Sequence, residues 1–258
     1  MKREESRFAE SDVFEGMISF RAVIDGYERG VTDRKITKVI YDTSRARKIA
    51  GHLSYIKAMS YKHGFELVGE DSDLIESMSV GTSHGGIITC CTDRSFPAIN
   101  SQALPESGFF VMLDGIEDPY NFGYAMRSIY ASGADGVILP ERNWMSAAGV
   151  VCRASAGASE LMKIYTASPN ECAEIFKSAG YRIVCAELEN SVSVYDADMK
   201  KPLLLAVGGE KRGLSKSLLD AADLIIKLDY GREFPQALSA ASAASILAFE
   251  VYRSNRLE

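Results

Sequence analysis

Three short segments of this 258-residue chain combine glycine with polar side chains that could do chemistry. The first follows an apolar run at 109–113 and carries Asn121, Gly123 and Arg127 at N-x-G-x-x-x-R spacing. Asn121 is expected to be the N-cap of a helix, and the start of that helix would offer free N–H groups to an anion. Because helical side chains lean toward the N-terminus, the Arg127 guanidinium would pass over Gly123 toward the same point. The segment predicts an anion site, although a capped helix with a surface arginine also explains it.

The second segment follows an apolar run at 203–207 and contains Gly208, Gly209, Glu210 and Gly213. Glycines at the end of a strand let a ligand approach the backbone closely. Glu210 would lie at the carboxyl edge of the sheet, where α/β proteins bind ligands. A plain turn explains the glycines almost as well, but it explains the acid less well.

The third segment runs from Leu228 to the start of a predicted C-terminal helix at about 235–253. Serines recur there at every third position, at Ser239, Ser242 and Ser245. Small side chains let a helix pack at short distance. The pattern therefore favours a helix pressed against the sheet or against another subunit.

Two further matches to known motifs fail on context. The G-x-S-x-G match at 81–85 lacks the preceding strand, the following helix and the later histidine that a nucleophile elbow needs, which argues against a serine hydrolase. The glycine cluster at 208–215 has Leu214 where a P-loop needs lysine, which argues against nucleotide hydrolysis. The chain also lacks a G-x-G-x-x-G after a strand, so a dinucleotide dehydrogenase is not expected.

Strand-like and helix-like runs alternate along the chain and predict an α/β protein of two domains. Residues 1–97 predict a small N-terminal α/β/α domain, because short apolar runs at 36–41, 65–68 and 86–91 are separated by helical patterns. A linker is expected at 98–107, and residues 108–258 predict a domain with a mainly parallel sheet covered on both faces.

Composition narrows the class further. The chain is 47% hydrophobic and 25% charged with 21 Gly and 7 Pro, which is typical of a globular protein. Five cysteines without a C-x-x-C pair predict free thiols and no metal site. The longest uncharged stretch, 234–249, is too short and polar to span a bilayer, and the charged N-terminus does not resemble a signal peptide. We therefore expect a cytoplasmic protein.

Taken together and in this order, the three segments resemble the SpoU (TrmH-like) family of RNA ribose 2′-O-methyltransferases in the SPOUT superfamily. The first family motif is matched by Asp118, Pro119, Asn121, Gly123 and Arg127. The second motif is matched by Gly208, Glu210, Gly213 and Leu214. In the third, Leu238 is kept, but Ala237 and Ser239 stand where the family has serine and asparagine.

The resemblance implies S-adenosylmethionine as the methyl donor, bound in a trefoil-knotted region by Gly208, Leu228 and Leu238. It implies methyl transfer to a ribose 2′-hydroxyl of rRNA or tRNA, without a metal. The catalytic residues would be Asn121, Arg127, Glu210 and Ser239. Of these, we expect Arg127 to clamp the RNA phosphate and the developing alkoxide, because a guanidinium is a poor base. The family also implies a homodimer, for which the C-terminal helix is a candidate surface.

A second hypothesis is an RNA-binding protein of the same fold that has lost or weakened catalysis, because the third motif diverges at Ala237 and Ser239. The intact first and second motifs argue against it.

RNA binding must be reconciled with a net charge of −6. Within 34–48, however, six basic residues accompany a single acid, Asp42. Such a local patch is sufficient for phosphate contacts, although a solvated charged face explains it as well. The N-terminal part also resembles the ribosomal-protein-like RNA-binding domain that is often fused to this family. The predicted RNA-binding residues are Arg34, Lys35, Lys38, Arg45, Arg47, Lys48 and His84.

Overall fold

The computed structural model describes residues 13–140 and 147–256, which form two compact units. Residues 13–95 and 147–161 make up the first unit, and residues 96–140 and 162–256 make up the second. A segment that follows β6 (Gly136–Leu139) thus packs with the N-terminal unit. The sequence analysis expected a single boundary near residue 97 and did not predict that residues 147–161 belong to the first unit.

The first unit is built on a four-stranded sheet with the strand order β1-β4-β2-β3. Strands β2 and β3 are parallel, whereas β4 pairs antiparallel with both β1 and β2. The elements are β1 (Val13–Glu15), α2 (Gly16–Glu28), β2 (Ile36–Asp42), α3 (Ala50–His63), β3 (Glu66–Glu70), α4 (Ser72–Met78) and β4 (Ile87–Cys91), followed after β6 by α6 (Ala148–Ala154) and α7 (Ala158–Leu161).

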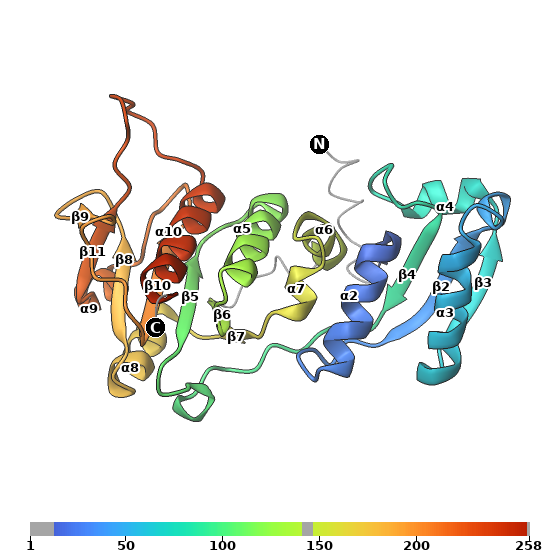
Figure 1. Ribbon diagram of the computed structural model, residues 1–258, viewed down its shortest axis with the longest axis horizontal. Coiled ribbons are helices and arrows are strands. Elements are labelled where there is room, and N and C mark those ends of the chain that lie inside the picture. Colours follow the sequence, from blue (N-terminus) through green and yellow to red (C-terminus); the bar gives the residue numbers. More distant parts are fainter. Residues whose placement is uncertain (1–12, 141–146, 257–258) are drawn as a thin grey trace. The chain divides into compact units, whose positions relative to one another are not determined.

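Successive residues of a strand point to opposite faces of the sheet, and both faces of this sheet are covered. Val39 and Ile87 lie in a core cluster with residues of α2 and α3. Their neighbours Ile40 and Ile88 pack on the other side, against Ile75 of α4. The expected α/β/α arrangement of this unit is therefore confirmed (Figure 1).

Ion pairs connect helices α6 and α7 to the N-terminal segments of the first unit. Arg153 Nη1 lies 2.7 Å from Glu15 Oε2, and Arg34 Nε lies 3.2 Å from Glu160 Oε2. The side chains of Arg34 and Glu160 are each only 4% exposed. A Cβ at Gly26 would lie 2.3 Å from the Glu160 carbonyl oxygen, so the close approach of α2 and α7 requires glycine there.

The second unit is built on a seven-stranded sheet with the order β7-β6-β5-β10-β8-β11-β9, in which every described pairing is parallel. This confirms the expected parallel sheet. Its elements besides β6 are β5 (Phe109–Asp114), α5 (Pro119–Ala131), β7 (Ile164–Thr166), α8 (Pro169–Ser178), β8 (Arg182–Ala186), β9 (Val192–Ser193), β10 (Leu203–Gly208), α9 (Lys216–Ala221), β11 (Leu224–Lys227) and α10 (Ala240–Asn255).

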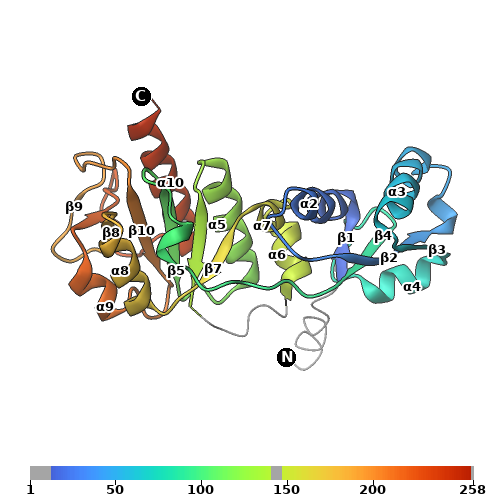
Figure 2. The same ribbon diagram turned by 90° about the horizontal axis from the view of Figure 1, so that it is seen from below.

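The central strands β5 and β10 are buried along almost their whole length, as expected for a parallel sheet that is covered on both faces. Helices α8 and α9 cover one face, and α5 and α10 pack together on the other (Figure 2). The rings of Phe110, Phe176 and Tyr181 meet edge to face beneath α8, with centroids 5.2–6.0 Å apart. This aromatic cluster packs near the amino ends of β5 and β8 and leaves their carboxyl ends free of it.

All five cysteines are free thiols, as expected, and four of them are buried. Burial raises the pKa of Cys152 and Cys185 to about 12, so both remain protonated at neutral pH. Across the described ranges 13–140 and 147–256, no helix is both long and apolar enough to cross a membrane.

Candidate active site

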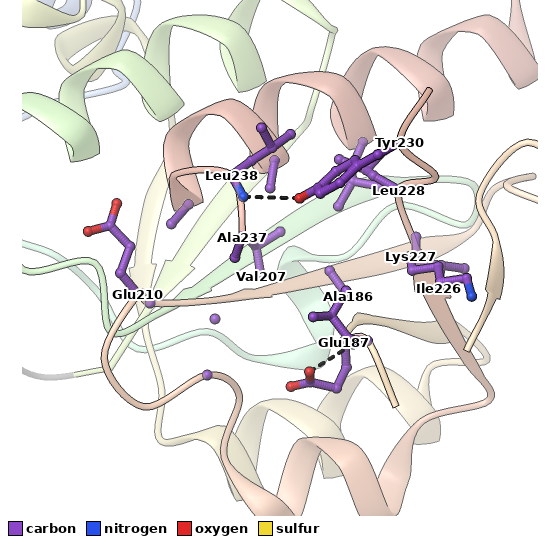
Figure 3. Close-up of a pocket in the computed structure, with 17 residues that line it drawn as sticks. Ala186, Glu187, Val207, Glu210, Ile226, Lys227, Leu228, Tyr230, Ala237 and Leu238 are labelled. Carbon is purple, nitrogen blue, oxygen red and sulfur yellow. Dashed lines mark hydrogen bonds between the residues drawn. The ribbon is translucent and has the colours of Figure 1, made fainter. Parts of the chain in front are cut away.

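A pocket of about 230 Å³ lies in the second unit at the carboxyl ends of β8, β10 and β11 (Figure 3). The start of α10 and the loop before it complete its wall. Gly208, Leu228 and Leu238, the three residues expected to contact a cofactor, all line this pocket, and so does Glu210. The fold thus gathers residues from two of the three sequence motifs around one cavity.

The glycines of the second motif are required by close backbone contacts. A Cβ at Gly208 would lie 2.4 Å from the carbonyl carbon of Gly213, and a Cβ at Gly209 would lie 2.0 Å from the carbonyl oxygen of Gly115. The Gly209 N–H donates to the Asp114 carbonyl at 2.8 Å. The turn after β10 is therefore pressed against the end of β5, and its backbone forms the floor of the pocket.

The pocket is mostly apolar with a few charged groups at its edges. Leu228, Leu238 and Leu247 supply aliphatic surface, while Glu187 and Glu210 supply carboxylates. A ligand with an apolar ring system and a few polar groups would be complementary to this lining.

The loop between β11 and α10 is closed by one hydrogen bond. The Leu238 N–H donates to the Tyr230 hydroxyl at 3.1 Å, and the Tyr230 ring lines the pocket. Tyr230 was not among the expected site residues. Its position two residues after Leu228, on a loop already predicted to bind a ligand, is the signal that sequence reasoning missed.

Helix α5 begins at Pro119 and is capped by Asp118, so the expectation that Asn121 is the N-cap is wrong. Asp118 Oδ1 accepts a hydrogen bond from the Asn121 N–H at 2.7 Å. Pro119 suits the first helical position because it has no N–H to satisfy. Asn121 consequently sits one turn into the helix, and its side chain Nδ2 donates to Glu210 Oε1 at 3.1 Å.

Arg127 lies on the same helix with an exposed side chain. Within the described part of the chain it forms no hydrogen bond or ion pair, so its guanidinium is available to an anion. Ser239 has a role that the sequence analysis did not predict. It is the N-cap of α10, and its Oγ accepts a hydrogen bond from the Ser242 N–H at 3.2 Å. The helix therefore begins at Ala240 rather than at about 235.

The predicted RNA-binding residues do not form one continuous surface. Arg34 is buried and paired with Glu160, so it is unavailable to a phosphate. Lys35 is exposed just before β2, whereas Arg45, Arg47 and Lys48 are exposed after its end, and Lys38 between them is paired with Glu66. Since β2 has seven residues, its two ends are about 20 Å apart.

The group at the carboxyl end of β2 includes both paired and unpaired cations. Arg45 Nε lies 3.2 Å from Asp42 Oδ2. Hydrogen bonds from Ser44 and Ser72 hold the pKa of Asp42 below its ordinary value, so this acid stays ionised. Arg47 and Lys48 form no ion pair with any residue in the described ranges. They are the cations best placed to meet a phosphate.

His84 is buried in the turn before β4 and is held on both ring nitrogens. The Gly86 N–H donates to Nδ1 at 3.1 Å, and Nε2 lies 3.2 Å from Glu76 Oε1. A Cβ at Gly86 would lie 3.1 Å from Cδ of Arg45, so the turn adjoins the basic group. Because its side chain is buried, His84 does not offer its ring to RNA as expected, and it instead holds the turn beside the basic group. No cluster of three or more His, Cys, Asp or Glu side chains suited to a metal occurs within 13–140 and 147–256.

Comparison with known proteins places these motifs in a family. The model of the SpoU rRNA Methylase family matches residues 108–249. A Staphylococcus haemolyticus protein assigned to the TrmH family of tRNA/rRNA methyltransferases is 35% identical over 144 residues, which is 55% of this chain and 57% of that relative. The chain thus aligns with little more than half of that relative's length.

Two other similarities cover more of the chain. The Bacillus subtilis protein YacO, assigned to the same family, is 26% identical over 228 residues, or 86% of this chain and 90% of YacO. The crystal structure of an AdoMet-bound rRNA methyltransferase from Sinorhizobium meliloti has a TM-score of 0.77 at 22% identity and covers 95% of this chain and 87% of that one. The last similarity shows that the fold is shared.

Proposed function

The chain belongs to the SpoU rRNA Methylase family, and from this membership we propose that it transfers a methyl group from S-adenosylmethionine to a ribose 2′-hydroxyl of rRNA or tRNA. The observation that carries the proposal is the pocket lined by Gly208, Leu228 and Leu238, whose edge residue Glu210 is bonded to Asn121. The proposed donor site would therefore lie beside the start of α5 at one edge of the sheet.

The pocket fits S-adenosylmethionine in its backbone and in its charge. Gly208 and Gly209 pack directly against the backbone of Gly213 and Gly115, and the turn that they form lines the pocket without a Cβ between its backbone and a ligand. The leucines would hold the adenine ring, and the carboxylates of Glu187 and Glu210 suit a ligand that carries positive charge. When bound, S-adenosylmethionine supplies a methyl group activated by its sulfonium sulfur. The trefoil knot expected around this pocket stays a prediction.

The side chains of α5 would prepare the RNA for this reaction. Arg127 is exposed and unpaired within the described residues, and a guanidinium stays protonated in proteins. It would bind the target phosphate and stabilise negative charge on the 2′-oxygen as this oxygen loses its proton to water, bonds to the methyl carbon and displaces S-adenosylhomocysteine. Asn121, held by Glu210, would position the ribose.

We propose that the exposed group Arg45, Arg47 and Lys48 contacts the RNA backbone away from the target nucleotide. These three residues lie within four consecutive positions, 45–48, shortly after β2. Because the chain is acidic as a whole, non-specific attraction to RNA should be weak, and a small basic group would determine how the RNA lies.

We further propose a homodimer, supported by an apolar strip on the outer side of α5 and α10. Tyr124, Ile246, Phe249 and Tyr252 are 40–52% exposed, and the rings of Phe249 and Tyr252 meet edge to face with centroids 6.3 Å apart. Exposed aromatic and aliphatic side chains on neighbouring helices are typical of protein interfaces.

The second candidate function is RNA binding without catalysis. It is favoured by the third motif, where Ala237 has no hydroxyl and the Ser239 hydroxyl is used to cap α10. Incubation with labelled S-adenosylmethionine and total RNA, followed by mass spectrometry of the nucleosides, separates the two candidates. Methyl transfer predicts a labelled 2′-O-methylnucleoside. Bound RNA without a labelled nucleoside would support the second candidate.

A further inference from the structure

Glu187 is the first residue after β8, and it lines the pocket. Val207 of β10 pairs with Ala186 of β8, so the next residues along these strands, Gly208 and Glu187, are neighbours. On its other side, the Glu187 N–H donates to the Ile226 carbonyl of β11 at 3.0 Å. The backbone of Glu187 is thus fixed between the two strands that carry the glycine turn and the leucine loop.

The Glu187 carboxylate is oriented, but its capacity to accept hydrogen bonds is not used up. Its Oε1 accepts a hydrogen bond from the Leu188 N–H at 2.8 Å, drawn as a dashed line in Figure 3. Its Oε2 faces the glycine turn, where a Cβ at Gly213 would lie 3.4 Å away. Among the described residues it has no cationic partner. A carboxylate offers about four acceptor positions, so several of them remain open toward the pocket.

A carboxylate in this position has a known use in other α/β folds. In dinucleotide-binding sheets, a glycine-rich turn follows one strand, and an acid farther along the chain accepts a hydrogen bond from a ribose hydroxyl of the ligand. Here the glycine turn follows β10, and the acid follows the adjacent parallel strand β8. In such an arrangement the glycines would let a ligand approach the backbone, and the acid would accept hydrogen bonds from its sugar.

We propose that Glu187 recognises the ribose of the methyl donor by accepting hydrogen bonds from its 2′- and 3′-hydroxyls. This inference rests on the proposed function, because it assigns a residue to the donor pocket. Glu187 is a specificity residue in this role. It would exclude ligands that lack the hydroxyls, because their loss leaves the carboxylate desolvated without a partner.

A different use of the same charge would be attraction of the positive sulfonium group. The two uses differ in their consequences. The ribose is common to S-adenosylmethionine and S-adenosylhomocysteine, whereas only the former carries the sulfonium charge. Recognition of the ribose therefore predicts equal losses for the two ligands when the carboxylate is removed.

The test measures binding by isothermal titration calorimetry with the full chain and three ligands. These are S-adenosylmethionine, S-adenosylhomocysteine and an S-adenosylhomocysteine analogue that lacks both ribose hydroxyls. In the unsubstituted protein we expect the analogue to bind about 10- to 100-fold more weakly than its parent, the range for hydrogen bonds to a charged group. Glu187→Ala should weaken both natural ligands by a similar factor and leave the analogue almost unchanged.

Two controls accompany the substitution. Glu189→Ala removes the same charge two residues away, outside the pocket lining, and should change none of the three affinities. Glu187→Gln keeps an acceptor for the Leu188 N–H, and together with thermal unfolding it separates a binding defect from a folding defect.

The outcomes separate this inference from the proposed function. If Glu187→Ala weakens the analogue as much as its parent, or weakens S-adenosylmethionine alone, the ribose assignment is wrong while the donor site stands. If the unsubstituted protein binds none of the natural ligands, the proposed function and this inference are both overturned.

Discussion

The side-chain amide of Asn121 donates to Oε1 of Glu210 at 3.1 Å, and this bond joins residues 89 positions apart in the sequence. It connects the start of α5 to the turn after β10. We expect Asn121→Ala and Glu210→Ala to reduce methyl transfer by similar factors, because each removes one partner of the bond and frees the other to move. Their combination should reduce it little further than the worse single change.

This double-mutant cycle is measured as kcat/KM for RNA at saturating S-adenosylmethionine. The bond lies at the surface, so thermal unfolding should change little in either variant. Fully additive losses would show that the two side chains act independently.

Replacement of Arg127 separates chemistry from donor binding. Arg127→Ala should lower methyl transfer about 100-fold or more, because it removes the charge opposite the developing alkoxide. The Kd for S-adenosylmethionine should stay within about twofold, because Arg127 does not line the pocket. Calorimetry and a labelled-methyl assay measure the two quantities, and a parallel loss of both would contradict the assigned role.

The close packing of Gly208 predicts that alanine substitutions at two glycines near the pocket have different effects. Gly208→Ala should lower the free energy of unfolding by about 1–3 kcal/mol and weaken donor binding, since the new Cβ would meet the Gly213 backbone. Gly231→Ala, in the loop beside the same pocket, is the matched control because nothing lies within 4 Å of its Cβ. Thermal unfolding and calorimetry on both variants check the prediction, which fails if the two behave alike.

Arg34 and Arg47 should behave differently although both belong to the basic segment of the sequence. Arg34→Ala leaves Glu160 buried without its partner and should cost about 3–5 kcal/mol of unfolding free energy. Arg47→Ala removes an exposed cation and should leave stability within about 0.5 kcal/mol.

RNA binding should show the reverse order for these two positions. Arg47→Ala should weaken RNA binding and reduce the slope of log K against log salt by about 1. Urea unfolding and filter binding over a series of salt concentrations measure both effects. An unchanged salt slope in Arg47→Ala would remove this residue from the proposed RNA surface.

The apolar strip on α5 and α10 predicts the oligomeric state. The protein should be a dimer at micromolar concentration by light scattering, and Phe249→Glu should give a monomer, because it places a charge in the interface. Tyr195→Glu is the control, since Tyr195 is also exposed but lies on the loop after β9, away from both helices. A monomer in the unsubstituted protein would refute the proposed homodimer.

Sequence reasoning succeeded where it depended on the order of elements. Alternating strands and helices predict a parallel sheet, and the carboxyl ends of parallel strands meet at one edge. The resemblance to the family implied that Gly208, Leu228 and Leu238 contact one cofactor, and the three residues do line one pocket at that edge. Family membership was likewise readable from motif spacing and is borne out by the match to residues 108–249.

It was less successful where a role depends on contacts between distant residues. Both Asp118 and Asn121 are good N-cap residues, and only the helix path shows that Asp118 takes this place. Arg34 reads as part of a basic surface, but Glu160, 126 residues later, buries it in an ion pair. Glu187 was also missed, because its position beside Gly208 depends on the pairing of β8 with β10.

The sequence alone determined the parallel α/β architecture, the family and the residues of its motifs, because each depends on local pattern and spacing. The tertiary structure decided which charges are free to act. Asn121 is tied to Glu210, Arg34 is neutralised by Glu160, and Ser239 is used in a helix cap. The physical reason is that burial and hydrogen bonding are set by neighbours in space, and these neighbours come from chain segments that a linear pattern does not connect.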